Sequence, residues 1–286
     1  MKISPANYII LRIAVIGLAL WSIASCARIQ SMQSNSVPQE VTEGANLLLA
    51  GDRPGAQARF TKSVATSNLD TCLAIVAFCQ MRKEWPLAAA YSVTTLARFP
   101  TADPEKRVFL LMCIATADLN MGDSKKAIQF AEDALKVMPD HYSTLNGTGY
   151  MYAEVYDPDR PGEMIKLLTA VKMIDQALAK AREANLPDTE MGAIVDSQGW
   201  VQYRLKNYKD AVANLSRAVS LAPDQSEIQY HLGMALAKMD QKDQALVALD
   251  RAIKLDPGFK AAIAAREELK VPTAVDLKPN IPAPGK

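Results

Sequence analysis

One pattern recurs near the C-terminus of this 286-residue chain at a step of 34 residues. Each copy places small, large apolar and proline residues at the same offsets. Small residues let two helices cross closely, larger apolar residues fill the remaining space, and proline ends the second helix. Because one helix pair cannot bury its apolar face alone, the 34-residue period predicts a stack of helix pairs. The two copies are Gly199, Ala211, Leu215, Ala218 and Pro223, and Gly233, Ala245, Leu249, Ala252 and Pro257.

Copies that match the pattern less completely lie upstream, and the sequence predicts six helix pairs in all. In the fourth pair Gly149 and Ala170 are 21 residues apart, whereas in the fifth pair the equivalent glycine and alanine are 12 apart. We therefore expect a nine-residue insertion within residues 155–166, where Asp, Pro and Gly are typical of turns. The expected solenoid covers residues 38–270, with pairs near 37–68, 69–104, 108–141, 142–188, 192–225 and 226–257 and a capping helix over 258–270.

The most specific stretch of the repeat is Asp196-Ser197-Gln198-Gly199-Trp200, followed by Tyr208 and Ala211. This stretch resembles tetratricopeptide repeat (TPR) lipoproteins of the bacterial cell envelope. The resemblance implies an all-α, right-handed solenoid of about six helix pairs with a C-terminal capping helix. It also implies a non-enzymatic scaffold that docks a protein or peptide in its concave groove, although a fold alone does not establish an activity.

In this family the first helices of successive pairs line the groove, and the matching positions of this chain are polar and aromatic. Exposed aromatic and arginine side chains are typical anchors at interfaces. Asn146 and Arg204 would clamp the backbone or carboxylate of an extended peptide. Trp200 fits two interpretations equally, a groove residue or a ring packed against the neighbouring helix. The implied groove residues are Asn146, Tyr150, Glu154, Asp196, Trp200, Tyr203, Arg204, Tyr230, Met234 and Lys238.

The N-terminus has the features of an export signal. Lys2 and Arg12 precede an apolar run over residues 13–21. This run is shorter than the roughly 20 residues that a membrane span needs, and a basic start with a short apolar core is typical of a secretory signal. The Ile-Ala-Ser sequence before Cys26 resembles a bacterial lipobox. The alternative is an ordinary cleaved signal with a coincidental cysteine.

The lipobox resemblance implies cleavage before Cys26 and a diacylglycerol on its thiol, which would hold the protein at a membrane surface. We expect a signal peptide over residues 1–25 and a lipidated cysteine with a flexible tether over residues 26–37. The absence of Asp after the cysteine favours the outer membrane, with the solenoid facing the periplasm. Residues 271–286 are rich in proline, and we expect a disordered tail there.

Three further cysteines are Cys72, Cys79 and Cys113. Cys72 and Cys79 lie on one expected helix, separated by about 10 Å of helical rise, so they cannot bond to each other. Apolar neighbours favour small buried side chains at all three positions. A disulfide from Cys113 to Cys72 or Cys79 is the alternative in an oxidising compartment.

Composition and motifs exclude several function classes. The chain has a net charge of +1 and no basic stripe, so it is a poor candidate for binding nucleic acid. Only two histidines are present, and the sequence lacks the motifs of zinc peptidases, phosphate-binding loops and serine hydrolases. We therefore expect no catalytic residue, no cofactor, no metal site and no small-molecule substrate.

The sequence thus favours an envelope-anchored scaffold or adaptor for a protein or peptide partner. A second hypothesis is a structural subunit of an envelope assembly or of a polysaccharide or exopolymer export complex. Such a subunit would associate through the convex face or the inserted loop. A third is an enzyme with a hidden site, which would require converging polar groups in a closed pocket.

Overall fold

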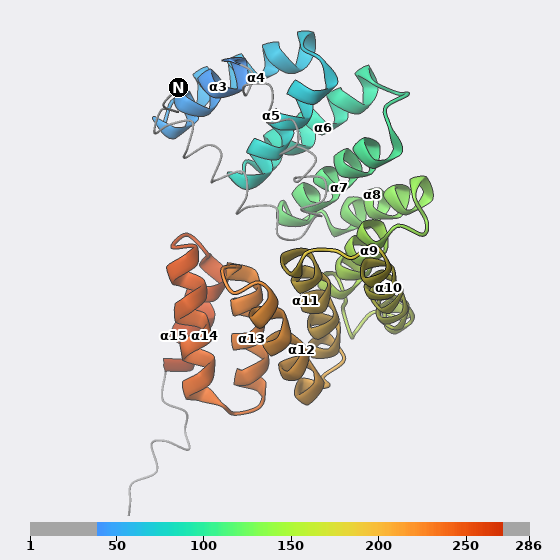
Figure 1. Cartoon of the computed structure of the whole chain (residues 1–286). Helices are drawn as coiled ribbons and strands as arrows, with labels where there is room; N and C mark the ends of the chain where they lie inside the picture. Colours follow the sequence, from blue (N-terminus) through green and yellow to red (C-terminus); the bar gives the residue numbers. More distant parts are fainter. Residues whose placement is uncertain (1–38, 271–286) are drawn as a thin grey trace, which may run out of the picture.

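The computed structural model describes residues 39–270, and all regular secondary structure within them is α-helical (Figure 1). The expected signal peptide, lipidated Cys26, tether and proline-rich tail lie outside these residues. None of the described helices is both long and apolar enough to span a bilayer.

Thirteen helices follow one another and pack in consecutive pairs within the described residues, which confirms the expected all-α solenoid. The last helix, α15, packs against α14 and α13 and ends the stack as a capping helix. The first six helices are α3 (Gln39–Leu49), α4 (Arg53–Thr66), α5 (Leu69–Met81), α6 (Trp85–Arg98), α7 (Pro104–Asn120) and α8 (Ser124–Val137). The remaining seven are α9 (Tyr142–Glu154), α10 (Glu163–Glu183), α11 (Asp188–Arg204), α12 (Tyr208–Leu221), α13 (Ser226–Lys238), α14 (Lys242–Leu255) and α15 (Lys260–Lys270).

Left-handed residues end the first helix of five pairs. In the second pair Lys83 has φ +55°, and its N–H donates to the Gln80 carbonyl at 2.9 Å. The next N–H, that of Glu84, donates to the Cys79 carbonyl at 2.9 Å. These two bonds satisfy carbonyls that the helix end would leave unpaired, and they reverse the chain within three residues. The equivalent left-handed residues are Gly51, Gly122, Lys206 and Asp240.

The regular spacing of small residues has a direct packing cause in the structure. A Cβ added at Gly199 would lie 2.6 Å from the Leu215 Cγ, because the two helices of the fifth pair cross there. Gly233 meets Leu249 in the same way at 2.8 Å, and Gly149 meets Ile174 at 2.9 Å. The 34-residue pattern therefore records the crossing point of each helix pair.

The expected insertion in the fourth pair is divided between a loop and a helix. Residues 155–162 connect α9 to α10, whereas three residues connect α11 to α12. The remaining four inserted residues extend the N-terminal end of α10 by about one turn. A second extension, which the sequence analysis did not detect, lengthens the C-terminal end of α10 and the N-terminal end of α11.

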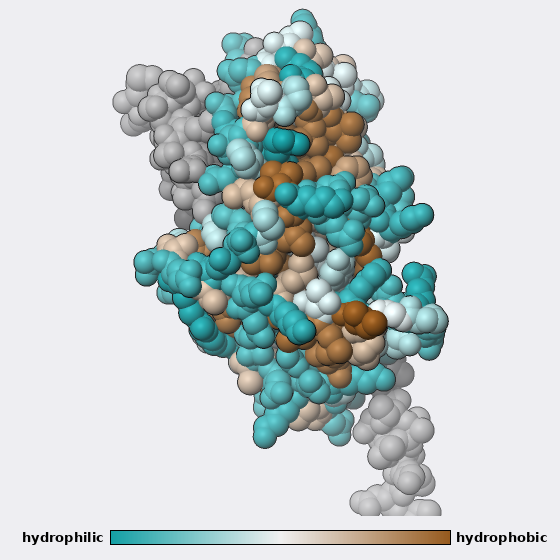
Figure 2. Space-filling model, turned by 90° about the vertical axis from the view of Figure 1, so that its right-hand side faces the viewer, coloured by the Kyte–Doolittle hydropathy of each residue, from teal (hydrophilic) through white to brown (hydrophobic). Residues whose placement is uncertain are grey.

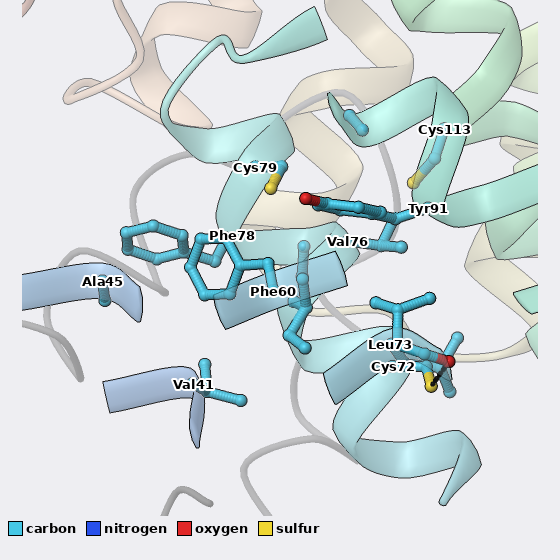
Figure 3. Packing of buried hydrophobic residues seen from close by; sticks show 14 of the residues in the cluster. Val41, Ala45, Phe60, Cys72, Leu73, Val76, Phe78, Cys79, Tyr91 and Cys113 are labelled. Atoms are coloured by element: carbon cyan, nitrogen blue, oxygen red, sulfur yellow. Dashed lines mark hydrogen bonds between the residues drawn. The ribbon is translucent and has the colours of Figure 1, made fainter. Parts of the chain in front are cut away.

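The N-terminal core holds the three cysteines (Figure 3). Cys72, Cys79 and Cys113 are all buried, and Cys72 and Cys79 have free thiols, so neither is joined to Cys113. Burial raises the pKa of Cys79 to about 12. The interpretation as small buried side chains is therefore the one that the structure supports. Phe60 and Phe78 fill the space beside them, with ring centroids 5.7 Å apart.

Candidate partner-binding groove

The first helices of the last three pairs, α9, α11 and α13, form one continuous surface. α11 packs against both α9 and α13, whereas no comparably close packing joins α10 to α12 or α12 to α14 in the described part of the chain. Helices on the inner side of a curved stack lie closer together than those on the outer side. Figure 1 shows this curve, with the first and last pairs facing each other across an open side. We call the surface of α9, α11 and α13 the inner groove.

The groove residues implied by the family resemblance fall into two groups. Asn146, Asp196 and Trp200 are buried, with 5%, 0% and 5% of their surface exposed. They form the floor of the groove rather than a free surface, and contact of any of them with a partner stays a prediction. The partly or fully exposed group comprises Tyr150, Glu154, Tyr203, Arg204, Tyr230, Met234 and Lys238.

A buried acid–imidazole pair joins the fifth and sixth helix pairs. His231 Nδ1 of α13 lies 2.9 Å from Asp196 Oδ1 and 3.0 Å from Asp196 Oδ2 on α11. Burial alone would lower the pKa of His231, but the charge and hydrogen bond of Asp196, with Glu154 and Glu227, raise it above its ordinary value. The imidazole therefore favours its charged form as the partner of a carboxylate buried at 0% exposure.

Trp200 packs between two rings, as the second interpretation of this residue expects. Its ring stacks on His231 at 4.1 Å between centroids and on Tyr203 at 4.7 Å. His231 belongs to the neighbouring helix, so Trp200 is a packing residue of the groove floor. Its indole Nε1 is buried and has no hydrogen-bond partner among the described residues.

The stack continues as an aromatic row along the groove. Tyr208 lies 5.7 Å from Tyr203 at one end, and at the other end Tyr230 lies 5.7 Å from His231. Tyr230 also contacts Phe259, at 5.1 Å between centroids, just before the capping helix. The rings thus extend from the fifth pair to the cap and give the groove a rigid, polarisable wall.

Two further carboxyl groups, Glu154 of α9 and Glu227 of α13, lie beside the buried pair. Both act electrostatically on His231 and on the hydroxyl of Tyr150. Burial raises the pKa of Glu227 above its ordinary value, and it raises that of Tyr150 well above its own. Within the described residues Glu227 forms no ion pair, so its negative charge is incompletely compensated.

Lys83, in the turn between α5 and α6, reaches across the open side of the curve to the other end of the chain. Its Nζ lies 2.6 Å from Asp256 Oδ2 and 5.2 Å from the centre of the Phe259 ring. Lys83 and Asp256 are separated by 173 positions in the sequence. The second helix pair therefore touches the last one.

Arg204 has a structural partner within the chain. Its Nη2 donates to the Tyr156 carbonyl at 2.5 Å, and its guanidinium lies 5.8 Å from the Tyr156 ring centre. The side chain thus holds the inserted loop against α11, whereas the resemblance implied a clamp on a ligand. Lys238 remains exposed at the end of α13.

Sequence reasoning missed His231 and Glu227 as groove residues. Neither occupies a position that the family resemblance marks, and His231 belongs to no catalytic or metal motif. A signal was nevertheless present, because Asp196 is a charged residue at a helix-packing position and requires a partner. The most direct place for that partner is the equivalent helix of the next pair, 35 residues on.

Comparisons with known proteins agree with this geometry. Residues 203–269 match the sequence profile of the tetratricopeptide repeat. A search of proteins with curated function finds no match. Among solved structures, a thermophilic TPR protein from Thermus thermophilus is similar, with a TM-score of 0.57 and 20% identity. The alignment covers 71% of this chain and 98% of that one.

The crystal structure of the Cut9–Hcn1 hetero-tetramer of the APC/C is also similar in fold, with a TM-score of 0.56 and 14% identity. That alignment covers 81% of this chain, which spans 42% of the other chain's length. At such identities the likeness concerns the fold alone. The profile match therefore shows a tetratricopeptide repeat over residues 203–269, and the solenoid of helix pairs in the rest of the described chain is similar to this family in fold.

Proposed function

We propose that this protein is an adaptor of the cell envelope that docks a protein or peptide partner in its inner groove. TPR proteins are in general protein-binding scaffolds. The observation that carries the proposal is the row of partly exposed rings and carboxyl groups on α9, α11 and α13. Rigid aromatic side chains give large contact areas at a low cost in conformational entropy, and carboxylates give direction to hydrogen bonds.

Site-specific photo-crosslinking tests this proposal. A photoreactive phenylalanine analogue at Tyr230 would stand in the groove, and the same analogue at Val247 would stand on the outer helix α14, where the side chain is 71% exposed. We expect a discrete crosslinked partner from Tyr230 in cells and none from Val247. Equal products from both positions, or none from Tyr230, would contradict groove binding.

The envelope location is proposed from the lipobox resemblance at Cys26. Metabolic labelling with a palmitate analogue should mark the full chain and leave the Cys26→Ser variant unlabelled. Fractionation should then place the labelled protein with the outer membrane and the variant in a soluble fraction. Identical labelling of both chains would rule out the lipid anchor at this residue.

A structural subunit of a larger envelope assembly is the second candidate, and one observation favours it. The N-terminal part of α10, which includes the added turn, exposes three large apolar side chains, those of Met164, Ile165 and Leu168, at 47%, 71% and 49%. Figure 2 shows apolar areas among the largely hydrophilic surface on this side of the molecule. Water-exposed apolar groups of this kind are typical of contact sites between subunits.

Sedimentation of the 27–286 fragment separates the two candidates. An assembly subunit that self-associates should form oligomers that the Ile165→Lys variant disrupts. Val247→Lys is the matched control, because that side chain is equally exposed at 71% but lies on α14. A monomer at all concentrations would exclude self-assembly through α10.

A further inference from the structure

Three carboxyl groups and one imidazole converge on the inner groove from three consecutive first helices. Glu154 comes from α9, Asp196 from α11, and Glu227 from α13 together with His231. Each of the three carboxylates acts electrostatically on His231. One imidazole cannot neutralise three carboxyl groups, so this part of the groove carries excess negative charge. We call these four residues, with Tyr150 and Tyr230, the acidic cluster.

The nearest lysine does not remove this excess. Lys83 acts on Glu227 electrostatically, but its ammonium group is already paired with Asp256 at 2.6 Å. The Asp196 carboxylate is in turn occupied by the imidazole of His231. Glu227 therefore remains a half-buried carboxyl group whose charged form the chain itself does not fully stabilise. A cation from outside the chain would supply that compensation.

The rings around the carboxyl groups suit an organic cation. Tyr150 and Tyr230 lie 6.3 Å and 5.7 Å from the His231 ring, on the same helices that carry Glu154 and Glu227. An ammonium or guanidinium group is attracted to the face of an aromatic ring as well as to a carboxylate, and burial strengthens both interactions. A metal ion is a poorer fit, since no three metal-ligating side chains of the described residues, those of this cluster included, are placed so that they could hold one together.

Two unpartnered polar groups at the same surface are independent signs of a missing ligand. Trp200, whose ring stacks on His231, has a buried Nε1 without a hydrogen-bond acceptor among the residues that the structure describes. Asn146 has a buried Oδ1 to which no group within residues 39–270 donates, and it lies on the same face of α9 as Tyr150 and Glu154, at intervals of four residues. Buried polar groups in native proteins are nearly always paired. The N–H and C=O groups of a peptide backbone are the complementary partners.

We propose that the acidic cluster receives one lysine or arginine side chain of a peptide segment whose backbone lies along the groove floor. This inference rests on the proposed function, since it names the chemistry of the partner that the inner groove binds. The ammonium or guanidinium group lies between Glu154 and Glu227 and against the rings of Tyr150 and Tyr230. The indole Nε1 of Trp200 donates to a carbonyl of the bound segment.

Short peptides with one variable side chain test the proposal on the 27–286 fragment. The probes are acetylated and amidated Gly-Gly-Xaa-Gly-Gly peptides with lysine, norleucine or glutamate at the centre. Norleucine keeps most of the aliphatic chain of lysine and removes the charge. Binding is measured by NMR shift changes and by tryptophan fluorescence, to which Trp200 and Trp85 of this fragment both contribute. We expect the lysine peptide to bind at millimolar concentration and the norleucine peptide at least about tenfold more weakly.

The variant Glu227→Gln should weaken binding of the lysine peptide about fivefold or more and leave the norleucine peptide unaffected. It should also fold, because burial already disfavours the charged form of this side chain. Glu183→Gln is the matched control, since it makes the same change at an exposed position at the end of α10. The control should bind the lysine peptide as the parent protein does.

The possible failures are distinguishable. If norleucine or glutamate peptides bind as tightly as the lysine peptide, the cationic partner is wrong and the groove remains a peptide site. Equal loss of binding in Glu227→Gln and Glu183→Gln would equally overturn the role of the acidic cluster. If no peptide binds and crosslinking from Tyr230 finds no partner, both this inference and the proposed function fail.

Discussion

At the residue scale, several positions of the solenoid hold side chains in conformations or environments that oppose their intrinsic preferences. Lys83, Lys206 and Asp240 adopt left-handed backbone angles in turns where the first and third pairs use glycine. Asp196 and His231 are buried charges in a helix interface. The surrounding structure compensates for the unfavourable energy of these residues. Helix-ending hydrogen bonds do so for the left-handed residues, and pairing with each other does so for the two buried charges.

The turn at Lys206 predicts a stabilising substitution. Lys206 has φ +65°, is exposed, and costs energy that glycine would not. Lys206→Gly should raise the free energy of unfolding by about 0.5–1 kcal/mol, after the added flexibility of the unfolded chain is subtracted. Lys209→Gly, three residues later within α12, should lower it by about 1 kcal/mol. Urea unfolding measures both, and a loss of stability in Lys206→Gly would contradict the strain argument.

The two histidines should titrate in opposite directions from the ordinary value. Asp196 raises the pKa of His231 against the effect of burial, and burial lowers the pKa of His141. NMR titration should therefore find His141 below and His231 above about 6.5. His141→Asn, which keeps a helix-capping side chain, assigns the two resonances. Coincident titration near 6.5 would refute the pairing.

The pairing of His231 with Asp196 should also make the free energy of unfolding depend on pH. A raised folded-state pKa means that the stabilisation from His231 is fully present below the unfolded value and is lost as the pH rises through the folded value. Unfolding free energy should thus decline from about pH 6 upward for this group. The groups that face His231 and set this window are Asp196, Glu154, Glu227, Tyr150 and Tyr230, with Lys83 acting on Glu227.

At the element scale, helix crossings explain why the repeat pattern is detectable. In each of the last three helix pairs, a glycine of the first helix lies at the point where the second helix crosses it. The side chain opposite the glycine is Ile174, Leu215 or Leu249. This contact is local in sequence, so its spacing could be predicted from the chain alone. The lengths of α10 and α11 were only partly predictable, because their extra turns add residues without a distinctive pattern.

The crossing at Gly199 predicts a specific loss of stability. A methyl group there would stand 2.6 Å from Leu215 Cγ and 3.1 Å from the Leu215 backbone N, so both helices would have to move apart. Gly199→Ala should cost about 1–3 kcal/mol in unfolding free energy. Gly258→Ala is the control, because its nearest neighbour lies at 3.4 Å, and it should stay within about 0.5 kcal/mol of the parent. Similar losses at both sites would argue against the close crossing.

At the scale of the whole molecule, the curve of the stack brings the second helix pair to the last one. The contact between Lys83 and Asp256 joins residues 173 positions apart, and Lys83 also acts electrostatically on Glu227 of the inner groove. The pair is partly exposed, with 50% and 28% of the side-chain surfaces accessible. Such an ion pair contributes only about 0–1 kcal/mol to stability, so its main effect is on shape.

Charge reversal at this contact tests the closure. Lys83→Glu should open the curve and increase the radius of gyration in small-angle scattering, with a change in unfolding free energy of at most about 1 kcal/mol. The double variant Lys83→Glu with Asp256→Lys restores opposite charges and should return the radius to that of the parent. An unchanged radius in Lys83→Glu would show that the contact does not hold the stack closed.

The sequence by itself determined the repeat, the helix pairs, the capping helix and the position of the insertion, because each depends on contacts between residues close along the chain. The family resemblance, rather than the sequence by itself, marked the first helices of the last three pairs as the surface where aromatic residues gather. Only the tertiary structure decided which of those residues are buried. It paired Asp196 with His231, turned Arg204 to the inserted loop, and brought Lys83 to the last helix pair. Those contacts join different repeats, and the curvature that creates them is the sum of many small packing angles that no local pattern records.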